Sequence, residues 1–301
     1  WSMAQVGNEW INYSQSYYKI KIAEEGIYKI SQTALSNVGI NTNNIDPRNI
    51  MMFRNGVQIP IYVVGEQDGT FNTTDYIEFY GYKNDGLIDQ RLYRLTEDQP
   101  NSEYSIHTDT AAYFLTWSAN TPGLRFTDYY DPNYAGKTSD TYFKHTEVKT
   151  YSSDFFGGIP IGNSAIMLLS EYASGEGFHK WVWSSQAKFE IDLPGLDVNG
   201  GAAIIKARAY SGNHNESEIS GGYNHEFGLS LESKGKLIAS KKTLGYQKID
   251  VAAIVSANEL KPTTRFFMGE ISYIGSGIFV NQLEVTYPRK MDMLNETFLN
   301  L

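Results

Sequence analysis

The chain has 301 residues, and its 25 Lys and Arg against 34 Asp and Glu give a formal charge of −9 with no basic stretch, which excludes an electrostatic footprint for nucleic acid or anionic lipid. The sequence contains no cysteine, so disulfides, thiolate metal sites and a cysteine nucleophile are excluded as well. Aromatic residues make up 14% of the chain, and because they suit the half-buried surface of a sheet, the composition favours strands over helices.

The first predicted segment is an N-terminal extension over residues 1–16, which has neither the basic nor the apolar region of a signal peptide. A signal peptide is therefore expected to be absent from the chain as given. No run of about 18 apolar residues occurs, so the chain is not expected to span a membrane. After the extension, apolar residues alternate over 18–22 and 27–30 around a turn that contains Gly26, which predicts a hairpin.

A short helix and a second hairpin follow. Ser31 is a good N-cap, and the apolar residues after it recur at helical spacing, so a helix is predicted near 31–38. The dipeptide Asn55-Gly56 separates the apolar runs 50–53 and 57–63. Both of its positions tolerate a positive φ, and this predicts a two-residue hairpin turn.

Strand-like alternation recurs through the rest of the chain, with almost no helical periodicity in the second half. Further strands are predicted at 75–80, 91–95, 113–117, 203–210, 227–232, 236–241, 264–273 and 279–287. In the clearest strand, 181–193, large apolar residues occupy the odd positions Trp181, Trp183, Ala187, Phe189, Ile191 and Leu193. We expect one continuous strand with that face buried.

These elements predict a mainly β protein with two domains, as the length of the chain also suggests. Residues 17–120 are expected to form a small hairpin-rich β domain with one or two short helices, and 140–290 an antiparallel β-sandwich of jelly-roll type. The polar, Gly- and Pro-containing stretch 121–139 is interpreted as a linker. Residues 291–301 are interpreted as a tail that leads to a further domain absent from the sequence.

The candidate metal ligands are His214, His225 and Glu226, which belong to one polar loop. Imidazole and carboxylate oxygen both suit zinc, so a metal-dependent hydrolase is one open hypothesis. Their spacing matches no metal motif, and a solvated loop is the favoured interpretation. We therefore predict no metal and no cofactor.

Other catalytic arrangements have no support in the sequence. There is no Gly-x-Ser-x-Gly elbow, phosphate-binding glycine loop or His-Glu-x-x-His motif, although a Ser/His/Asp triad is recognised by geometry rather than by order. Asp75 and Glu78 lie three apart in a predicted strand, so they point to opposite faces and do not form an acid/base pair. The segment 68–72 offers oxygen ligands for calcium but is better explained as a plain turn. No catalytic residue is predicted.

Aromatic residues offer a second hypothesis, a carbohydrate-binding sandwich. Trp181 and Trp183 share one face of a strand, and a flat aromatic platform there would suit sugar stacking, although a core-facing strand is the favoured interpretation. Tyr129, Tyr130 and Tyr134 lie in the predicted linker and complete the candidate binding surface.

The first domain, taken as an ordered set of short motifs, resembles the region that precedes the peptidase domain in gingipain-like cysteine peptidases of family C25, and within them the type IX secretion system sortases. The motifs are Tyr18–Ile22, Glu25–Ile30, Leu35, Gly39, Met52–Gly56, Asp68–Phe71 and Asp75–Gly81. The resemblance covers 17–117 well, and in 140–290 it rests on a sandwich that ends in Val285–Arg289.

The resemblance implies a protein at the extracellular or outer-membrane surface that cleaves a C-terminal sorting signal from exported cargo and joins the cargo to lipopolysaccharide. The family's peptidase uses a Cys/His dyad, and this sequence has no cysteine, so no catalytic residue is carried over. The expected role is therefore a non-catalytic module for folding, scaffolding or docking. Its expected partners are a downstream peptidase domain of the same polypeptide, secretion-system components or cargo proteins, and not nucleic acid.

Overall fold

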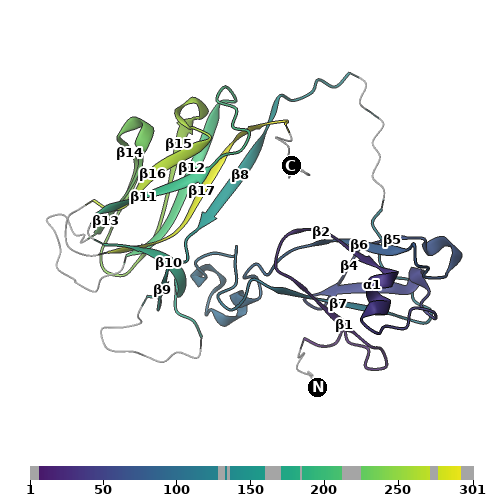
Figure 1. Cartoon of the computed structure of the whole chain (residues 1–301). Helices are drawn as coiled ribbons and strands as arrows, with labels where there is room; N and C mark the ends of the chain where they lie inside the picture. The colour runs from purple at the N-terminus through teal and green to yellow at the C-terminus, as the bar shows by residue number, and fades with distance from the viewer. Residues whose placement is uncertain are drawn as a thin grey trace. The chain divides into compact units, whose positions relative to one another are not determined.

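The computed structural model describes residues 7–127, 133, 136–159, 171–183, 185–211, 225–271 and 277–292. It divides into two compact units, which are described separately: the first comprises 1–87 and 107–134, and the second comprises 88–106 and 135–301. Figure 1 shows the strands that dominate both units. The expectation of a mainly β protein is confirmed. None of the helices in the described ranges has the length and hydrophobicity needed to cross a membrane.

The first unit contains two antiparallel sheets and one helix. Its elements are β1 (Tyr18–Ile22), β2 (Gly26–Ser31), α1 (Gln32–Asn37), β3 (Ile50–Arg54), β4 (Val57–Ile59), β5 (Tyr62–Val64), β6 (Tyr76–Gly81) and β7 (Ala111–Trp117), with 3-10 turns at Pro47–Asn49 and Glu66–Asp68. The sheets have the orders β1-β7-β3-β4 and β2-β6-β5. Their buried aliphatic and aromatic side chains form one core, which includes Met52, Ile77 and Tyr113.

Two local predictions for the first unit, a helix cap and a hairpin turn, are confirmed. The Ser31 hydroxyl accepts a hydrogen bond from the Ala34 N–H (3.1 Å) and caps α1, as predicted. Asn55 and Gly56 both have a positive φ, of 51° and 80°, and join β3 to β4 as predicted.

The predicted first hairpin is wrong, although both of its strands exist. β1 pairs with β7, and β2 pairs with β6, so the two strands belong to different sheets. Gly26 has a φ of 156°, a value that L side chains rarely adopt, and the link at this glycine carries the chain from one sheet to the next instead of folding it back.

Residues before β1 pack on the first unit instead of extending away from it. The Trp10 ring lies 5.1 Å from the Phe53 ring and 5.5 Å from the Phe114 ring, between centroids. Tyr17 packs edge-on against the same indole. This aromatic cluster fixes the segment over β3 and β7, whose side chains Phe53 and Phe114 are directly paired.

The second unit is an antiparallel sandwich. Its strands are β8 (Tyr142–Thr150), β9 (Asp154–Phe156), β10 (Gly177–Val182), β11 (Gln186–Asp192), β12 (Ala202–Ser211), β13 (His225–Leu231), β14 (Lys236–Thr243), β15 (Lys248–Ser256), β16 (Thr263–Glu270) and β17 (Ile278–Lys290). One sheet has the order β15-β12-β17-β10-β9 with β8 on β17, and the other has the order β11-β16-β13-β14. A single apolar core contains side chains from both sheets, among them Ile205, Phe227 and Val285.

The expected continuous strand over 181–193 is in fact two strands in opposite sheets. β10 pairs with β17, whereas β11 pairs with β16. Val182 is the core-facing residue at the end of β10, and Phe189 is core-facing in β11, so the buried positions change from even to odd between them. The change follows from crossing the sandwich, because each sheet presents its own inner face to the shared core.

The segment 88–106 belongs to the second unit, although we had placed it in the first domain and predicted a strand at 91–95. It contains the 3-10 turns Asp89–Leu92 and Thr96–Asp98 and no regular strand. Two further 3-10 turns of the second unit, outside this segment, are Glu232–Lys234 and Ala257–Glu259. Hydrogen bonds tie it to the sandwich: the Tyr93 hydroxyl donates to the Glu176 carbonyl (2.6 Å). Among the apolar residues of 91–95, Tyr93 is buried whereas Leu92 and Leu95 are exposed, so the run lacks the alternating buried face that a strand would need.

Candidate functional site

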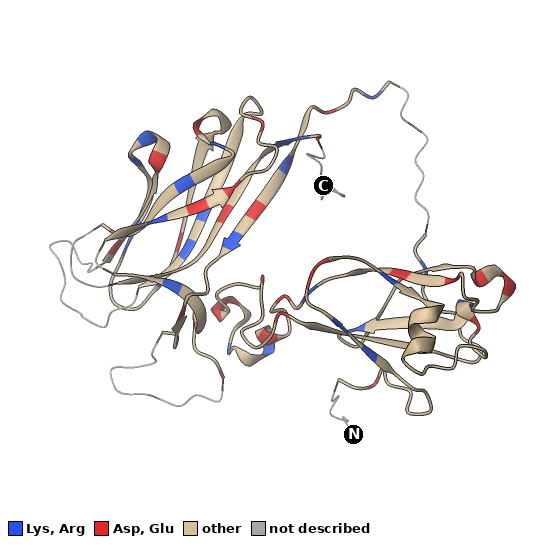
Figure 2. Cartoon of the chain, in the orientation of Figure 1, with Lys and Arg blue, Asp and Glu red and all other residues tan. Residues whose placement is uncertain are grey.

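The outer face of the six-stranded sheet carries most of the polar chemistry that the described residues bring together. On β12, Ala207 points into the core while its neighbours Lys206 and Arg208 point outward, as strand alternation requires. Figure 2 shows cationic and anionic positions side by side on these strands. Asp250 of β15 and Glu284 of β17 face outward beside them.

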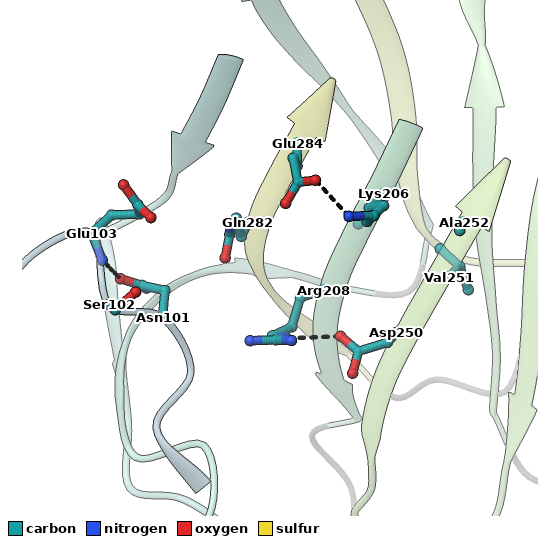
Figure 3. Close-up of a pocket in the computed structure, with 11 residues that line it drawn as sticks. Asn101, Ser102, Glu103, Lys206, Arg208, Asp250, Val251, Ala252, Gln282 and Glu284 are labelled. Atoms are coloured by element: carbon teal, nitrogen blue, oxygen red, sulfur yellow. Dashed lines mark hydrogen bonds and ion pairs between the residues drawn. The ribbon is translucent and has the colours of Figure 1, made fainter. Parts of the chain in front are cut away.

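The register of β12 with β15 and β17 places these four residues in two cross-strand ion pairs, which Figure 3 shows. Lys206 lies opposite Glu284, with Nζ 2.7 Å from Oε1. Arg208 lies opposite Asp250, with Nε 2.7 Å from Oδ1. Exposed pairs of this kind contribute at most about 1 kcal/mol to folding, so stability does not require them.

These pairs form the floor of a groove of about 490 Å³. Its wall is the chain at Asn101, Ser102 and Glu103, which runs past the ends of the outward side chains (Figure 3). The lining residues are Asn101, Ser102, Glu103, Lys206, Ala207, Arg208, Asp250, Val251, Ala252, Gln282 and Glu284. We call this the charged groove.

A β-bulge and a buried amide hold the wall in place. The pairing of β12 with β17 shifts register between Arg208 and Ala209, which leaves Asn281 fully buried. The Asn281 side chain donates to the Phe178 carbonyl (3.2 Å) and accepts from the Asn101 amide (3.4 Å). The guanidinium of Arg208 also donates to the Pro100 carbonyl (2.9 Å), so the wall is bonded to the floor.

Lys248 lies at one end of the charged groove and extends its cationic character. Its ammonium donates to the Glu97 carbonyl (3.2 Å) and lies 3.8 Å from an Asp250 carboxylate oxygen. Burial, followed by the nearby charge of Arg208, lowers the pKa of Lys248 from its usual value. The groove thus has positive and negative groups in alternation, framed by the amides of Asn101 and Gln282.

The charged groove offers ion-pairing and hydrogen-bonding groups to a ligand. Fixed charges of both signs and side-chain amides match a polar polypeptide segment, which carries charged side chains together with backbone donors and acceptors. Among the described residues, no group of three His, Asp or Glu side chains is placed to hold a metal ion.

The structure places the predicted metal ligands in different situations. His214 lies outside the described residues. His225 is fully buried at the start of β13, and its Nδ1–H donates to the Glu270 carboxylate at 3.0 Å. Glu226 is partly buried, and its backbone N–H donates to the other oxygen of Glu270 (2.8 Å). His225 is therefore bonded between two strands of the sandwich, and the metal hypothesis gains no support.

The predicted aromatic surface is described only in part. Trp181 is half-buried and its ring packs at a tilt of 45° against Phe279, with centroids 4.2 Å apart, so it covers the outer face of the sheet and does not enter the core. Trp183, just beyond β10, is 60% exposed and lies 5.7 Å from the Trp181 ring. Tyr129, Tyr130 and Tyr134 lie outside the described residues.

Sequence reasoning missed the charged groove. The alternation of Lys206 and Arg208 with Ile205, Ala207 and Ala209 indicates a strand with one solvated face, and that signal was available. Their partners Glu284 and Asp250, and the wall at Pro100, lie between 42 and 108 positions away along the chain. Only strand register could bring them together.

The comparisons with known proteins give a likeness of fold. No family model and no curated protein matches the sequence. The structure is similar to dimeric latent PorU from Porphyromonas gingivalis, with a TM-score of 0.57 and 14% identity, over 91% of this chain and 24% of that chain. This chain therefore spans about a quarter of the length of the solved protein.

Two carbohydrate-active proteins are much less similar in structure. A β-porphyranase of glycoside hydrolase family 86 from Bacteroides plebeius has a TM-score of 0.26 at 10% identity, over 92% of this chain and 35% of that chain. The C-terminal CBM6 of LamC from Zobellia galactanivorans has a TM-score of 0.21 at 16% identity, over 35% of this chain and 75% of that chain. Likenesses this low carry no argument about fold or function.

Proposed function

We propose that this chain is the non-catalytic forward part of a larger gingipain-like C25 protein of the type IX sortase group, and that it serves at the cell surface as a scaffold and docking module. The observation that carries the proposal is the likeness to PorU, a gingipain-like type IX sortase, which extends over 91% of this chain and so includes both units. The ordered motifs over residues 17–117 point to the same group independently of the fold.

Because the sequence contains no cysteine, we place the catalytic part of such a protein outside these 301 residues. A C25 peptidase requires a cysteine nucleophile, and none of the 301 residues supplies one. His225 is held by Glu270 in the sandwich interior, at 0% exposure, so it is not available as half of a dyad. The two β-sheet units of this chain instead provide surfaces on which a partner can dock.

The charged groove is the docking surface that we assign to this function. Its two ion pairs are exposed and contribute little to folding, yet a bulge and a buried amide fix their surroundings. Preorganised charges of both signs give selectivity for a partner with a matching charge pattern, because a mismatched partner would meet like charges. The partners that we propose are cargo C-terminal sorting domains, secretion components and the peptidase domain.

A binding experiment with matched variants tests the proposal. The purified chain is immobilised, and cargo C-terminal sorting domains and the separately expressed peptidase domain are passed over it. We expect saturable binding that falls at least about tenfold in the double variant Lys206→Ala, Glu284→Gln. The control is Arg265→Ala, Glu190→Gln, which removes an exposed cross-strand pair with the same N–O distance (2.7 Å) from the other sheet and should bind normally.

The proposal fails if no partner of these kinds binds and sorting continues normally in cells whose protein lacks residues 17–290. Equal loss of binding in both double variants would remove the charged groove from the proposal and would point to a different surface of the same module.

Carbohydrate binding at the tryptophan pair is the second candidate function. The specific observation is that Trp183 is 60% exposed beside a half-buried Trp181, which leaves aromatic surface open to a sugar ring. A glycan array probed with the wild-type chain and with Trp183→Ala tests this candidate. Silence with the wild type, or equal signals from both proteins, would end it.

A further inference from the structure

The first unit carries a second groove, of about 640 Å³, that is distinct from the surfaces already described. It lies between the segment that precedes β1 and the loop that follows β7, with Asn44 at its side. The lining residues are Asn12, Ser14, Gln15, Ser16, Asn44, Trp117, Ser118, Ala119, Asn120 and Thr121. We call it the neutral groove. Its volume falls within the range of roughly 300–1,000 Å³ that small-ligand sites occupy.

None of the described residues that line the neutral groove is charged. It offers the side-chain amides of Asn12, Gln15, Asn44 and Asn120, hydroxyl groups from the serines and Thr121, and the indole of Trp117. The charged groove of similar size, in contrast, contains Glu103, Lys206, Arg208, Asp250 and Glu284. A phosphate, carboxylate, ammonium or metal ion would find no countercharge in the neutral groove, so the ligand that fits is uncharged.

Hydrogen bonds fix the two walls of the neutral groove against each other. The Gln15 amide donates to the Trp117 carbonyl (3.0 Å), and the Thr116 hydroxyl donates to the Ser16 carbonyl (2.8 Å). Behind the loop, the Asn49 amide donates to the Ala119 carbonyl (3.1 Å). These bonds connect positions 70 to 102 residues apart, so the groove exists before any ligand binds.

The polar side chains at the rim are held in defined orientations. Asn12 Oδ1 accepts from the backbone N–H and the hydroxyl of Ser14 (3.1 and 2.7 Å), which fixes the amide plane and directs its Nδ2 donors away from that turn. Ser118 Oγ accepts from the Thr121 N–H (2.6 Å) and donates to the Thr121 carbonyl (2.8 Å), which sets the loop that carries Asn120. Preorganised donors and acceptors lower the entropy cost of binding.

We propose that the neutral groove binds a neutral oligosaccharide. Vicinal hydroxyls both donate and accept, so they match amide and hydroxyl side chains. The indole of Trp117 is half-buried and stacks on the Tyr18 ring, with 5.5 Å between centroids, and the apolar face of a pyranose can pack on the part of the indole that lines the groove. A neutral peptide offers similar backbone groups, but its side chains would need apolar subsites. The lining supplies only Trp117 and Ala119 for that purpose.

Calorimetric titration of the full chain with maltotriose, cellotriose and mannotriose tests this proposal. We expect at least one of the three to bind with a dissociation constant of about 10 μM to 1 mM, and a trisaccharide of galacturonic acid to bind more weakly. Asn12→Ala and Asn120→Ala each remove an exposed amide and should raise the dissociation constant about five- to tenfold without affecting folding. Asn199→Ala removes an exposed amide from the second unit, so it is the matched control and should leave the dissociation constant unchanged. Trp183→Ala tests whether the sugar binds at the tryptophan pair instead.

Three results would overturn the proposal. The first is that none of the neutral trisaccharides binds. The second is binding that Trp183→Ala abolishes while Asn12→Ala and Asn120→Ala leave it intact, which would transfer the site to the tryptophan pair. The third is binding of a Ser- and Asn-rich peptide in place of the sugars. None of these results bears on the docking function assigned to the charged groove.

Discussion

Two buried histidines illustrate how single residues are used in the second unit. His225 and Glu270 are both fully buried and hydrogen-bonded to each other across β13 and β16. His179 is also fully buried, but its Nε2–H donates to a backbone carbonyl, that of Gly175 (2.8 Å), among the rings of Phe156, Tyr210 and Phe279. The first residue belongs to a polar pair and the second lies in an aromatic cluster, so they respond differently to mutation.

Glu270→Ala is expected to reduce the free energy of unfolding by about 3 kcal/mol or more. The substitution removes the acceptor of both the His225 Nδ1–H and the Glu226 backbone N–H in an environment closed to water. Urea unfolding at neutral pH measures the loss. Glu284→Ala, which breaks an exposed pair, is the matched control and should cost less than about 1 kcal/mol. Similar small losses in both variants would contradict this account.

His179 is expected to make the protein less stable at mildly acidic pH. Burial lowers the pKa of His179 from 6.5 to about 4, and the Gly175 carbonyl opposes this only in part. Between those two values the unfolded chain binds a proton that the folded chain does not, so stability is complete above pH 6.5 and falls as the pH drops toward 4. The loss over this window is about 3 kcal/mol.

Urea unfolding of the wild type and of His179→Gln at pH 7 and pH 4.5 tests the role of this histidine. Glutamine keeps a neutral N–H donor near Gly175 but does not titrate, so the variant should lose clearly less stability on acidification. Parallel curves for the two proteins would show that other groups cause the acid sensitivity.

Among the elements, a tight turn depends on residues that are adjacent in sequence, whereas strand pairing depends on residues that are far apart. The Asn55-Gly56 turn depends on the φ preferences of two adjacent residues, and β3 pairs with β4 across it as predicted. The predicted run 57–63, however, is divided into β4 and β5, which belong to different sheets. The link through Gly26 also joins two strands, but their partners β6 and β7 come about 50 and 90 residues later along the chain. A hairpin signal is reliable when the turn dipeptide demands it, and weak when it rests on a glycine between two strands.

Gly56→Ala is expected to reduce the free energy of unfolding by about 1–2 kcal/mol. Gly56 has a φ of 80°, and an added Cβ would lie 3.0 Å from Cδ1 of Trp10. Gly157→Ala is the control, because Gly157 has no positive φ and a Cβ there would meet nothing within 4 Å. Chemical denaturation compares the two variants, and an equal effect of both would contradict the role given to the turn.

At the scale of the whole molecule, the segment 88–106 makes the second unit discontinuous in sequence. It enters that unit from within the first, forms the wall of the charged groove and returns. Besides the Tyr93 bond, the Gly175 N–H donates to the Asp98 carbonyl (2.8 Å) and the Tyr104 hydroxyl donates to the Phe178 carbonyl (2.9 Å). The sandwich is therefore not an independent piece that begins after the linker.

Replacing residues 88–106 with a Gly/Ser linker of equal length is expected to lower the stability of the second unit by several kcal/mol, because each of these bonds contributes about 1 kcal/mol. Hydrogen exchange at the amides of β12 and β17 measures the change. Tyr104→Phe, which removes one bond only, should have about a fifth to a third of that effect. Unchanged amide protection after the replacement would mean that the segment contacts the sandwich without stabilising it.

The sequence by itself determined the features that depend on composition or on a few adjacent residues. These are the absence of cysteine chemistry, the predominance of strands, the Ser31 cap, the Asn55-Gly56 turn and most strands of the sandwich. Each follows from side-chain type or backbone preference within about ten residues, where sequence order and spatial order are the same.

Only the tertiary structure decided which strands pair, where 181–193 changes sheet, to which unit 88–106 belongs, and where the two grooves lie. Arg208 and Pro100, for example, are 108 residues apart and yet bonded across the charged groove. Alternation tells which residues of a strand share a face, but not which other strand lies opposite, because that depends on the register and packing of the whole sandwich.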